Sequence, residues 1–252
     1  MSGILSLAGR RILVTGGSRG VGAAVARLAA QAGADVAITY YTRAEAAAGV
    51  VAELQAMGRK AVAVGGDHAD PAAVAAMFRD AVAVLGGLDG FVANAGIWPV
   101  DDVPLREMTD ARWGETIRVN LDGVFVTTRE ALRHMTAGSI VFVSSTAGQR
   151  GESGHADYAA TKGALIAITK SMAGECGPAI TVNCLAPGWI DTEMSAGALQ
   201  GPDRARIEAA IPLRRVASAD DTAGPIIFLL SDLARHITGE ILNVNGGSVL
   251  CG

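Results

Sequence analysis

A tyrosine and a lysine, Tyr158 and Lys162, stand four positions apart in the stretch DYAATKGAL, whose other residues are mostly small and apolar. In a helix, residues four apart lie on one face, so the Lys162 ammonium can come close to the Tyr158 phenol. A nearby positive charge favours the phenolate and lowers the pKa of a phenol from its usual value of about 10, toward a range useful for proton transfer. The same spacing also occurs where a lysine is solvated and a tyrosine covers a core, so the pair alone leaves both interpretations open.

A glycine-rich segment, TGGSRGVG at residues 15–22, follows the first β-branched run and precedes an alanine-rich stretch. Gly16, Gly20 and Gly22 would let the backbone turn tightly and come close to a pyrophosphate. The helix that follows would present unpaired N–H groups and the positive end of its dipole to the same anion. This segment therefore predicts dinucleotide binding.

The elements that must position these groups alternate between strands and helices. Short β-branched runs predict seven strands, at 11–15, 35–40, 60–64, 88–93, 139–144, 179–186 and 240–244. Apolar residues at helical spacing predict helices near 20–32, 43–57, 71–85, 110–134, 156–175 and 219–231. The alternation predicts an α/β fold of the Rossmann type, a doubly wound sheet of seven mostly parallel strands with helices on both faces, in a single domain over residues 1–252. Such a sheet binds ligands beyond the carboxyl ends of its strands.

The composition argues against several classes of function. The chain has 252 residues and a net charge of −4, without a run of lysine or arginine, so nucleic-acid binding is not expected. It shows no signal-peptide pattern and no apolar stretch of membrane-spanning length, which predicts a cytoplasmic protein with no membrane partner. The cysteines, at 176, 184 and 251, and the histidines, at 68, 134, 155 and 236, show no metal-ligand spacing, so no metal is expected.

The choice of coenzyme is read near the end of the second predicted strand. A carboxylate there would bond the adenosine ribose and repel a 2′-phosphate, but the sequence has Tyr40, Tyr41 and Thr42 instead. Arg19 in the glycine-rich segment and Arg43 after the strand are placed to meet a phosphate. These positions predict a preference for NADP(H), with NAD(H) as the runner-up, although both arginines would also suit a solvated surface.

Six motifs together resemble the short-chain dehydrogenase/reductase family. They are TGGSRGVG at 15–22, NAG at 94–96, Asn120 in VNLDGVF, Ser145 in VSSTAG, YAATK at 158–162 and APGWIDT at 186–192. They occur in the order and at the intervals of that family, and the resemblance runs from about residue 8 to the end of the chain. Each motif is modestly specific, whereas six in register are hard to obtain by chance.

The resemblance implies a role for each of four catalytic residues. Tyr158 would exchange a proton with the substrate oxygen, and Lys162 would lower the pKa of Tyr158 and bond the nicotinamide ribose. Ser145 would hold the substrate oxygen, while its neighbour Ser144 would face away because successive strand residues point to opposite sides. Asn120 would anchor a water leading from Lys162 to solvent, or would be a helix-kink residue that bonds its own backbone. Independently of the family, hydride transfer to a carbonyl needs hydrogen-bond donors and then a proton, which a hydroxyl, a phenol and a lysine supply.

The resemblance also implies the residues that contact the coenzyme. Asp67 would contact the adenine, and Ile190 and Thr192 would contact the nicotinamide carboxamide. Ala93 departs from the family, which often has a second asparagine before NAG. The full predicted set is Gly16, Ser18, Arg19, Gly20, Gly22, Tyr40, Arg43, Asp67, Asn94, Gly96, Tyr158, Lys162, Pro187, Gly188, Ile190 and Thr192.

Two tryptophans are expected beside the nicotinamide. Trp98 follows NAGI and Trp189 follows APG, so both would form an apolar wall for the substrate or seal the loops against the core. The irregular segment 188–212 has short helical pieces interrupted by Gly197, Gly201 and Pro202. With Met194, Leu199 and Ile207 it is predicted to be a flexible apolar lid over the substrate, to which Met194 would contribute.

The substrate and the partners stay open between several hypotheses. The family resemblance places reduction of 3-oxoacyl groups on acyl carrier protein first, where Arg204, Arg206, Arg214 and Arg215 would meet an acidic partner. The segment SMAGECGPA carries no basic residue, which argues against that partner and keeps open a reductase of free ketones or a dehydrogenase of an alcohol, polyol or sugar. A non-catalytic dinucleotide-binding regulator belongs to another class, and the presence of Ser145, Tyr158 and Lys162 argues against it. The helix at 156–175 is apolar nearly all round, which, with the resemblance, predicts a homotetramer.

Overall fold

One parallel sheet organises the part of the chain that the structure describes. The structure is a computed structural model and describes residues 5–250. Within that range seven strands pair in the order β3-β2-β1-β4-β5-β6-β7, and every pairing is parallel. The strands are β1 (Arg11–Val14), β2 (Asp35–Tyr40), β3 (Ala61–Gly65), β4 (Gly90–Ala93), β5 (Gly138–Val143), β6 (Ile180–Pro187) and β7 (Ile241–Val244). The order reverses between β1 and β4, which is where a doubly wound sheet opens a crevice for ligands.

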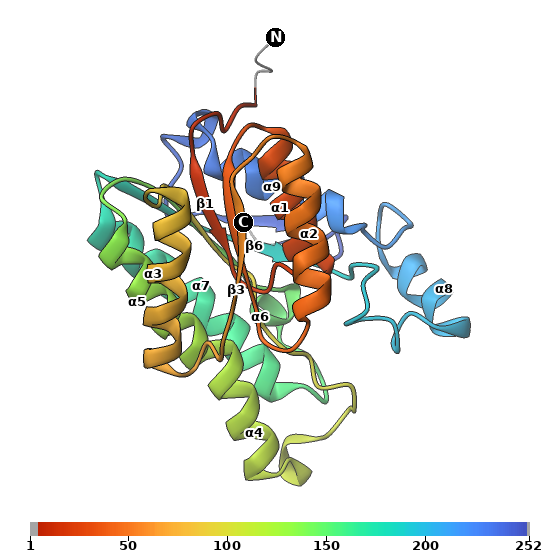
Figure 1. Cartoon of the computed structure of the whole chain (residues 1–252). Helices are drawn as coiled ribbons and strands as arrows, with labels where there is room; N and C mark the ends of the chain where they lie inside the picture. Colours follow the sequence, from red (N-terminus) through yellow and green to blue (C-terminus); the bar gives the residue numbers. More distant parts are fainter. Residues whose placement is uncertain (1–4, 251–252) are drawn as a thin grey trace.

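Helices cover both faces of the sheet, as Figure 1 shows. On one face lie α1 (Gly20–Gln31), α2 (Ala44–Ala56) and α9 (Ala219–Leu230). On the other lie α3 (Pro71–Leu85), α5 (Gly123–His134) and α7 (Ala156–Cys176), with α4 (Asp110–Ile117) beyond one end of α5. The fold class and all seven predicted strands are thus confirmed, each to within two residues at either end.

The strands alternate their side chains between two cores. Ile12 and Val14 pack among the helices of the first face, while Leu13 between them packs among those of the second. Val36 and Ile38 share the first core in the same way, and Ala37 lies in the second. Because both faces are buried, most positions of such a strand are apolar, which explains the β-branched runs in the sequence.

Local signals set several helix ends. The Asp70 side chain accepts a hydrogen bond from Ala72 N at 2.9 Å and Pro71 occupies the first position of α3. Ser218 and Asp221 form a reciprocal capping box at the start of α9. These short-range contacts allow the beginnings of both helices to be predicted to within a residue.

Three elements differ from the prediction. The expected helix at 110–134 is interrupted by a π-helical segment, Arg118–Asp122, which separates α4 from α5. A short helix, α6 (Thr146–Arg150), follows β5, and α8 (Gly201–Ala210) begins at the glycine and proline that were expected to interrupt short helical pieces in 188–212. Two 3₁₀ turns, Leu105–Glu107 and Asp232–Ala234, complete the described secondary structure.

The segment around α8 stands away from the sheet, as the blue helix in Figure 1 shows. It carries a small core of its own, made by Leu199, Ile211 and Val216 with Trp189 and Ile207 packed against them. The excursion begins after β6, and a parallel bridge between Ile190 and Ala217 joins its two sides. This arrangement gives the predicted lid an internal structure rather than an open loop.

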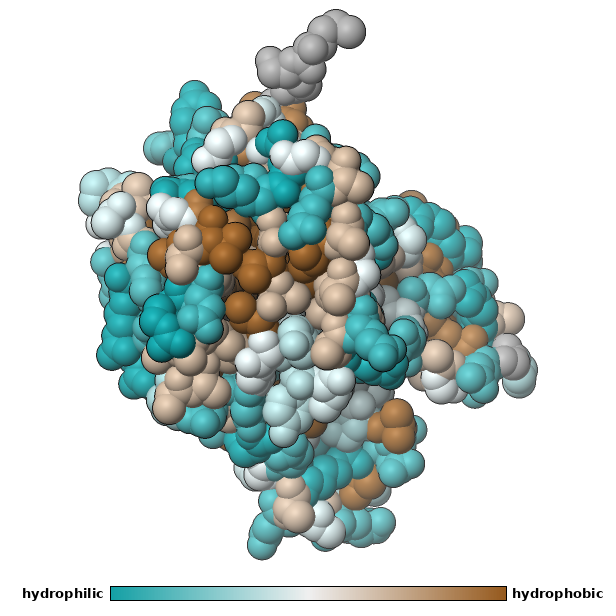
Figure 2. Space-filling view, in the orientation of Figure 1, coloured by the Kyte–Doolittle hydropathy of each residue, from teal (hydrophilic) through white to brown (hydrophobic). Residues whose placement is uncertain are grey.

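The surface in Figure 2 is mostly hydrophilic at its rim, and hydrophobic residues gather between α2 and α3 over the edge strand β3.

No helix among residues 5–250 combines the length and the apolarity needed to cross a membrane. The same residues contain no group of three or more histidine, cysteine or acidic side chains able to hold a metal ion. Cys251 lies outside the described residues.

Candidate active site

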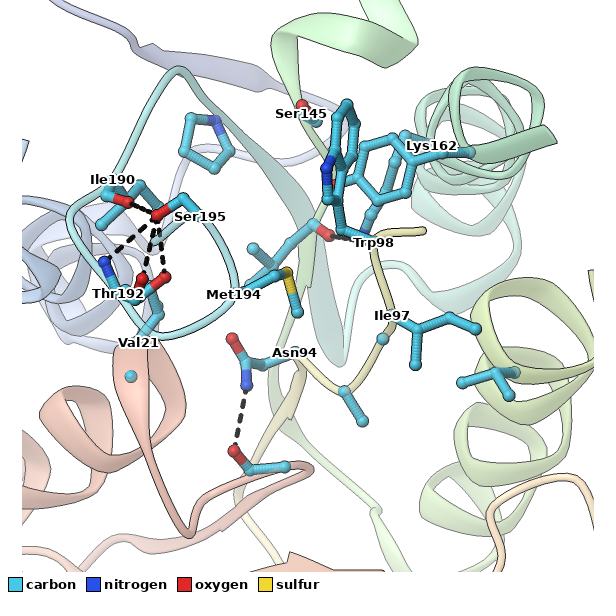
Figure 3. A pocket seen from close by; sticks show the side chains of 18 of the residues that line it. Val21, Asn94, Ile97, Trp98, Ser145, Lys162, Ile190, Thr192, Met194 and Ser195 are labelled. Atoms are coloured by element: carbon cyan, nitrogen blue, oxygen red, sulfur yellow. Dashed lines mark hydrogen bonds between the residues drawn. The ribbon is translucent and has the colours of Figure 1, made fainter. Parts of the chain in front are cut away.

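A cleft of about 480 Å³ opens at the carboxyl ends of the strands, within the range typical of small-molecule sites. Figure 3 shows side chains converging on it from several elements, among them Asn94 after β4, Ser145 after β5, Lys162 on α7 and Thr192 in the lid. The predicted residues Trp98, Trp189 and Met194 line the cleft, as does the whole predicted coenzyme set except Gly22. Asn120 also lies outside the lining, one layer behind it.

The glycine-rich segment has the geometry that a pyrophosphate requires. Gly16 and Gly20 have φ values of +67° and +54°, a region that side chains with a Cβ rarely adopt. A Cβ on Gly22 would lie 2.3 Å from the Gly16 carbonyl oxygen, and one on Gly17 would lie 2.5 Å from Ile38 Cβ. Only glycine fits these two positions without a backbone shift, so the chain keeps its close turn at the start of α1.

The start of α1 is ready to receive an anion. Its N-cap residue, Arg19, makes no side-chain cap hydrogen bond, and the first turn contains no acidic residue. Free N–H groups and the positive end of the helix dipole therefore face the cleft, which is the donor set that binds phosphate groups at helix N-termini. The residues present fit the pyrophosphate of a dinucleotide.

Asn94 links the glycine-rich segment to the centre of the sheet. Its Nδ2 donates to Thr15 O at 3.0 Å and to Gly16 O at 3.3 Å, while its backbone N–H donates to Thr15 Oγ1 at 3.0 Å. These bonds fix the turn from the side of β4. Asn94 was predicted to contact the coenzyme, and in the structure its amide also holds the loop that would bind it.

The far end of the cleft carries the residues predicted to select the coenzyme. Arg19 and Arg43 both line it, and Tyr40 stands half-buried beside them. Both guanidinium groups contact the carboxylate of Glu193 in the lid, Arg19 Nη1 at 2.6 Å and Arg43 Nη2 at 3.4 Å. The two arginines therefore converge on one carboxylate.

Asp67 follows β3 at the expected edge of the cleft. Its carboxylate accepts from Ala69 N at 2.9 Å and from Arg118 Nη1 at 2.7 Å. Burial would raise the pKa of Asp67, but these two hydrogen bonds and the guanidinium charge outweigh burial and lower it. Asp67 is thus held as a charged group beside the position predicted for the adenine.

Ser145 caps a helix and also interacts with the Tyr158 phenol. Its Oγ accepts from Ala147 N at 3.1 Å and so caps α6. A hydrogen bond from Ser145 to the Tyr158 phenol lowers the pKa of that phenol in part. The Ser145 hydroxyl can therefore accept from the backbone and still donate its own proton into the cleft. Ser144 points elsewhere, as predicted, and donates to Lys162 O at 2.7 Å.

The Tyr158 phenol has a raised pKa in this structure, about 12, because burial disfavours the phenolate more than Ser145 favours it, and the charge of Glu152 adds to the effect. The sequence predicted the opposite shift, a lowering by Lys162. The ammonium instead donates to Val143 O at 2.8 Å and lies 5.6 Å from the Tyr158 ring centroid. The spacing of residues in the sequence does not reveal burial, and burial has the largest effect on the pKa of Tyr158.

Lys162 is almost fully buried, with 5% of its surface exposed. Burial lowers the pKa of its ammonium to about 8, because the charged form is poorly solvated there. A lysine with this pKa exchanges its proton near neutral pH. It is therefore suited to a proton pathway as well as to hydrogen bonding.

Asn120 lies in the π-helical segment and is fully buried. Its Nδ2 donates to Ile97 O at 2.9 Å and its Oδ1 accepts from Ile97 N at 2.7 Å. A Cβ on Gly96 would lie 3.1 Å from Asn120 Oδ1 and 3.7 Å from Lys162 Nζ, so the three groups adjoin. The side chain bonds a neighbouring loop rather than its own helix backbone, which removes the simple helix-kink interpretation.

The residue before Tyr158 fixes the start of α7. Asp157 is fully buried and accepts from Arg112 Nε at 3.1 Å and from Thr116 Oγ1 at 2.9 Å. Arg112 also donates to the carbonyl oxygens of Asp101 and Gly154. These contacts from α4 hold the first turn of α7, and with it the Tyr158 backbone.

An aromatic group encloses Tyr158 on the substrate side. The Trp98 ring meets the Tyr158 ring edge-on at 4.6 Å between centroids, and the Trp189 ring lies 6.3 Å from that of Trp98. On its other side Trp98 stacks on His155 at 3.9 Å. His155 contacts Pro99 O at 2.8 Å and Asp102 Oδ1 at 3.2 Å. Trp98 is thus fixed as a wall of the cleft.

Three residues in or beside the cleft were not singled out by the sequence. From the sequence, His155 was considered only as a metal ligand and rejected. Its position three residues before Tyr158 was the signal that could have placed it beside the active site. Glu193 follows the APGWIDT motif directly, which was its only signal. Gly17 is required by the approach of Ile38, a contact between distant segments that local sequence does not reveal.

The four arginines predicted to receive an acidic carrier are engaged within the chain. Arg204 pairs with Asp191 at 2.8 Å and with Glu208 at 3.1 Å, and Arg206 pairs with Asp203 at 3.1 Å. Arg215 pairs with Asp221 at 2.6 Å, and Arg214 donates to Ala209 O. Neighbouring carboxylates therefore offset much of the positive charge expected there.

Comparison with known proteins points to one family. A family model described as enoyl-(acyl carrier protein) reductase matches residues 16–248. The 3-oxoacyl-[acyl-carrier-protein] reductase FabG of Staphylococcus aureus is 40% identical, over 93% of this chain and 96% of that protein. L-rhamnose 1-dehydrogenase (NAD(P)(+)) of Sphingomonas sp. is 39% identical, over 96% of each chain. A short-chain dehydrogenase of Burkholderia cenocepacia, solved in complex with NADP, is 40% identical with a TM-score of 0.90, over 96% of this chain and 98% of that one.

Proposed function

Because this chain belongs to the short-chain dehydrogenase/reductase family of oxidoreductases, we propose that it interconverts a ketone and a secondary alcohol with NADP(H) as its preferred coenzyme. The observation that carries the proposal is the meeting of the Ser145 hydroxyl, the Tyr158 phenol and the Lys162 ammonium in one cleft with a glycine-rich phosphate turn. The nicotinamide would supply or accept the hydride when bound.

The protein groups would handle the oxygen and its proton. Ser145 donates a hydrogen bond to the substrate oxygen and stabilises negative charge that develops on it. Tyr158 gives that oxygen its proton during reduction and takes it back during oxidation. Lys162, with its pKa near 8, returns a proton to Tyr158, and Asn120 behind it orders the path to solvent.

The coenzyme would lie along the cleft from Asp67 to the lid. The turn at Gly16, Gly20 and Gly22 and the start of α1 would hold the pyrophosphate, and Arg19 and Arg43 would hold the ribose 2′-phosphate. Ser18, Asn94, Gly96, Pro187, Gly188, Ile190 and Thr192 complete the proposed contacts. A relative solved with NADP and a relative named for NAD(P)(+) support this class of coenzyme.

The first candidate substrate is a 3-oxoacyl thioester. Similarity to 3-oxoacyl-[acyl-carrier-protein] reductase over most of the chain supports it. The pairing of Arg204, Arg206 and Arg215 with carboxylates argues against strong docking of an acidic carrier protein. A small thioester is therefore a better candidate than the carrier-bound form.

A free cyclic alcohol or sugar is the second candidate. The relative that acts on L-rhamnose supports it, and so does the aromatic enclosure formed by Trp98, Trp189 and His155. Rings of this kind pack well against the flat face of a cyclic substrate.

We also propose that the enzyme lies in the cytoplasm and assembles as a homotetramer.

The test is a comparison of coenzyme turnover with three substrates. Acetoacetyl-coenzyme A is offered with NADPH and with NADH, and L-rhamnose and cyclohexanol are offered with NADP⁺ and NAD⁺. We expect kcat/KM to be highest for the thioester and higher with NADPH than with NADH. Equal kcat/KM with both coenzymes would contradict the NADP(H) preference, and a higher value for rhamnose or cyclohexanol would select the second candidate.

The variant Tyr158→Phe tests the proton-transfer role. Removing the phenol oxygen is expected to lower kcat by a factor of about 10²–10⁴, the usual contribution of a general acid, with a much smaller effect on equilibrium binding of NADPH. Turnover equal to that of the parent would rule out Tyr158 as the proton donor.

A further inference from the structure

Glu193 joins the lid to the two arginines at the coenzyme end of the cleft. Arg19 stands at the start of α1 and Arg43 at the start of α2, and their guanidinium groups meet on Glu193 Oε2 at 2.6 Å and 3.4 Å. We propose that Glu193 is a coenzyme-specificity residue, whose carboxylate occupies on Arg19 and Arg43 the place that a ribose 2′-phosphate would take, so that NADP(H) must displace it and NAD(H) need not. This inference rests on the proposed function, in which the two arginines receive that phosphate.

The contact lies where a phosphate could reach it. Arg19, Arg43 and Glu193 all line the same cleft, and their side chains are 47%, 56% and 60% exposed. Among the contacts of the described residues, Glu193 is the acidic group that meets either guanidinium. One negative charge between two positive ones leaves the group with a net positive charge, so a phosphate dianion would still be attracted.

The lid holds Glu193 toward the arginines through a tight turn. Ser195 Oγ donates to Ile190 O and accepts from Thr192 N at 3.2 Å, and Ser195 N donates to Thr192 O at 3.1 Å (Figure 3). These bonds close residues 190–195 around the backbone of Glu193. The hydrogen bond from Arg19, aided by the arginine charges, lowers the pKa of the Glu193 carboxyl, which is therefore charged at neutral pH.

Displacement of Glu193 would also free one end of the lid. A second contact, between Asp191 and Arg204, lies within the lid at 2.8 Å and does not involve the coenzyme arginines. Exposed ion pairs of this kind are weak, so a phosphate that binds both arginines can replace Glu193. Binding of the phosphate is then coupled to release of the segment predicted to cover the substrate.

The proposal is tested with Glu193→Gln, which removes the charge and keeps the size of the side chain. Calorimetric binding of adenosine 2′,5′-bisphosphate is compared with that of adenosine 5′-monophosphate, so that the readout does not depend on turnover. We expect the variant to bind the bisphosphate about two- to tenfold more tightly than the parent does, because one exposed ion pair and one repulsive charge are removed. We expect the variant and the parent to bind the monophosphate equally well.

Two control variants separate this effect from others. Glu53→Gln breaks the ion pair between Glu53 and Arg27, whose atoms lie 2.5 Å apart. This pair is similarly exposed and lies outside the cleft. Asp191→Asn loosens the lid without touching Arg19 or Arg43. Neither control is expected to change the ratio of the two affinities.

Proteolysis of the lid gives a second readout. Trypsin cleaves after Arg204 and Arg206, and we expect the bisphosphate to speed this cleavage in the parent but not in Glu193→Gln, where the contact is already lost. An unchanged affinity ratio in Glu193→Gln overturns the proposal. A parent protein that binds both nucleotides equally contradicts the NADP(H) preference itself, and a selective gain in Glu193→Gln would then still support the role of Glu193.

Discussion

At Tyr158 two effects oppose each other, and the structure shows which is larger. Ser145 stabilises the phenolate by a hydrogen bond, whereas burial destabilises it, and the pKa of the phenol rises to about 12. Tyr158 is therefore protonated at neutral pH, as a tyrosine of ordinary pKa also is, and its raised pKa makes the phenol a weaker acid. The protonated state suits the reductive direction, in which the substrate oxygen needs a proton.

The raised pKa can be measured directly from tyrosinate absorbance. The chain has three tyrosines, at 40, 41 and 158, so the difference between the parent and Tyr158→Phe isolates the third. We expect this difference to show no phenolate below about pH 11, because the pKa lies above the ordinary value of about 10. Circular dichroism at each pH would confirm that the fold persists. Ionisation of Tyr158 near or below pH 10 would contradict the effect of burial.

The sequence placed most single residues well and their electrostatics poorly. The motifs located Ser145, Tyr158 and Lys162, and the structure brings them into one cleft. The direction of the Tyr158 pKa shift was wrong because it depends on burial and on where the Lys162 ammonium points. His155 and Glu193 were missed because their partners, Trp98 and Arg19, are distant in sequence.

At the scale of elements, the turn between β1 and α1 illustrates how a small residue enables a site. Gly22 lies directly against the Gly16 carbonyl, and Asn94 Nδ2 would be 2.6 Å from an added Cβ. The turn is therefore stabilised by close backbone approach, which no larger side chain permits. The same approach leaves the N–H groups of α1 directed at the cleft.

The variant Gly22→Ala tests this packing. Its methyl group would collide with the Gly16 backbone, and we expect a loss of about 1–3 kcal/mol in the free energy of unfolding together with weaker NADPH binding. Gly49→Ala is the matched control, because Gly49 lies within α2 with no atom near its added Cβ. That control should gain about 0.4–1 kcal/mol and bind NADPH normally. Chemical denaturation and calorimetry measure both, and equal behaviour of the two variants would refute the steric explanation.

The strands could be predicted because burial on both faces leaves a continuous apolar signal. The helix α6 could not, because it has only five residues, and the extent of α8 could not, because Gly201 and Pro202 at its start usually mark loops. The π-helical segment at Arg118–Asp122 was also missed. It accompanies the bonds between Asn120 and Ile97, which join segments 23 positions apart.

At the scale of the whole molecule, some apolar side chains remain exposed on the face of α4 and α5. Phe125 is 55% exposed and carries Arg129 over its ring at 4.8 Å, and Trp113 is 39% exposed. On α7, which the sequence singled out for subunit pairing, Ile166 and Ile168 pack partly against the chain's own core. The helices α5 and α7 lie on the same face of the sheet, so one subunit contact could cover the exposed side chains of both.

Sedimentation velocity tests the predicted tetramer. We expect the parent to sediment as four 25.6 kDa chains. Phe125→Asp should yield smaller species, because it places a charge on this exposed apolar face. Val84→Asp, at an exposed position of α3, serves as the control and should leave the assembly unchanged. A parent that sediments as a single chain would contradict the prediction.

The segment predicted to be a lid departs from the sheet and rejoins it at one turn, residues 245–247. An added Cβ on Gly188 would lie 3.1 Å from Asn245, and Leu213 N donates to Gly246 O at 3.2 Å. A segment whose two ends are anchored side by side can change in length or composition with little strain on the strands below it. A change of sequence in this segment can therefore alter what the cleft accepts, while the residues at the ends of the strands keep their positions.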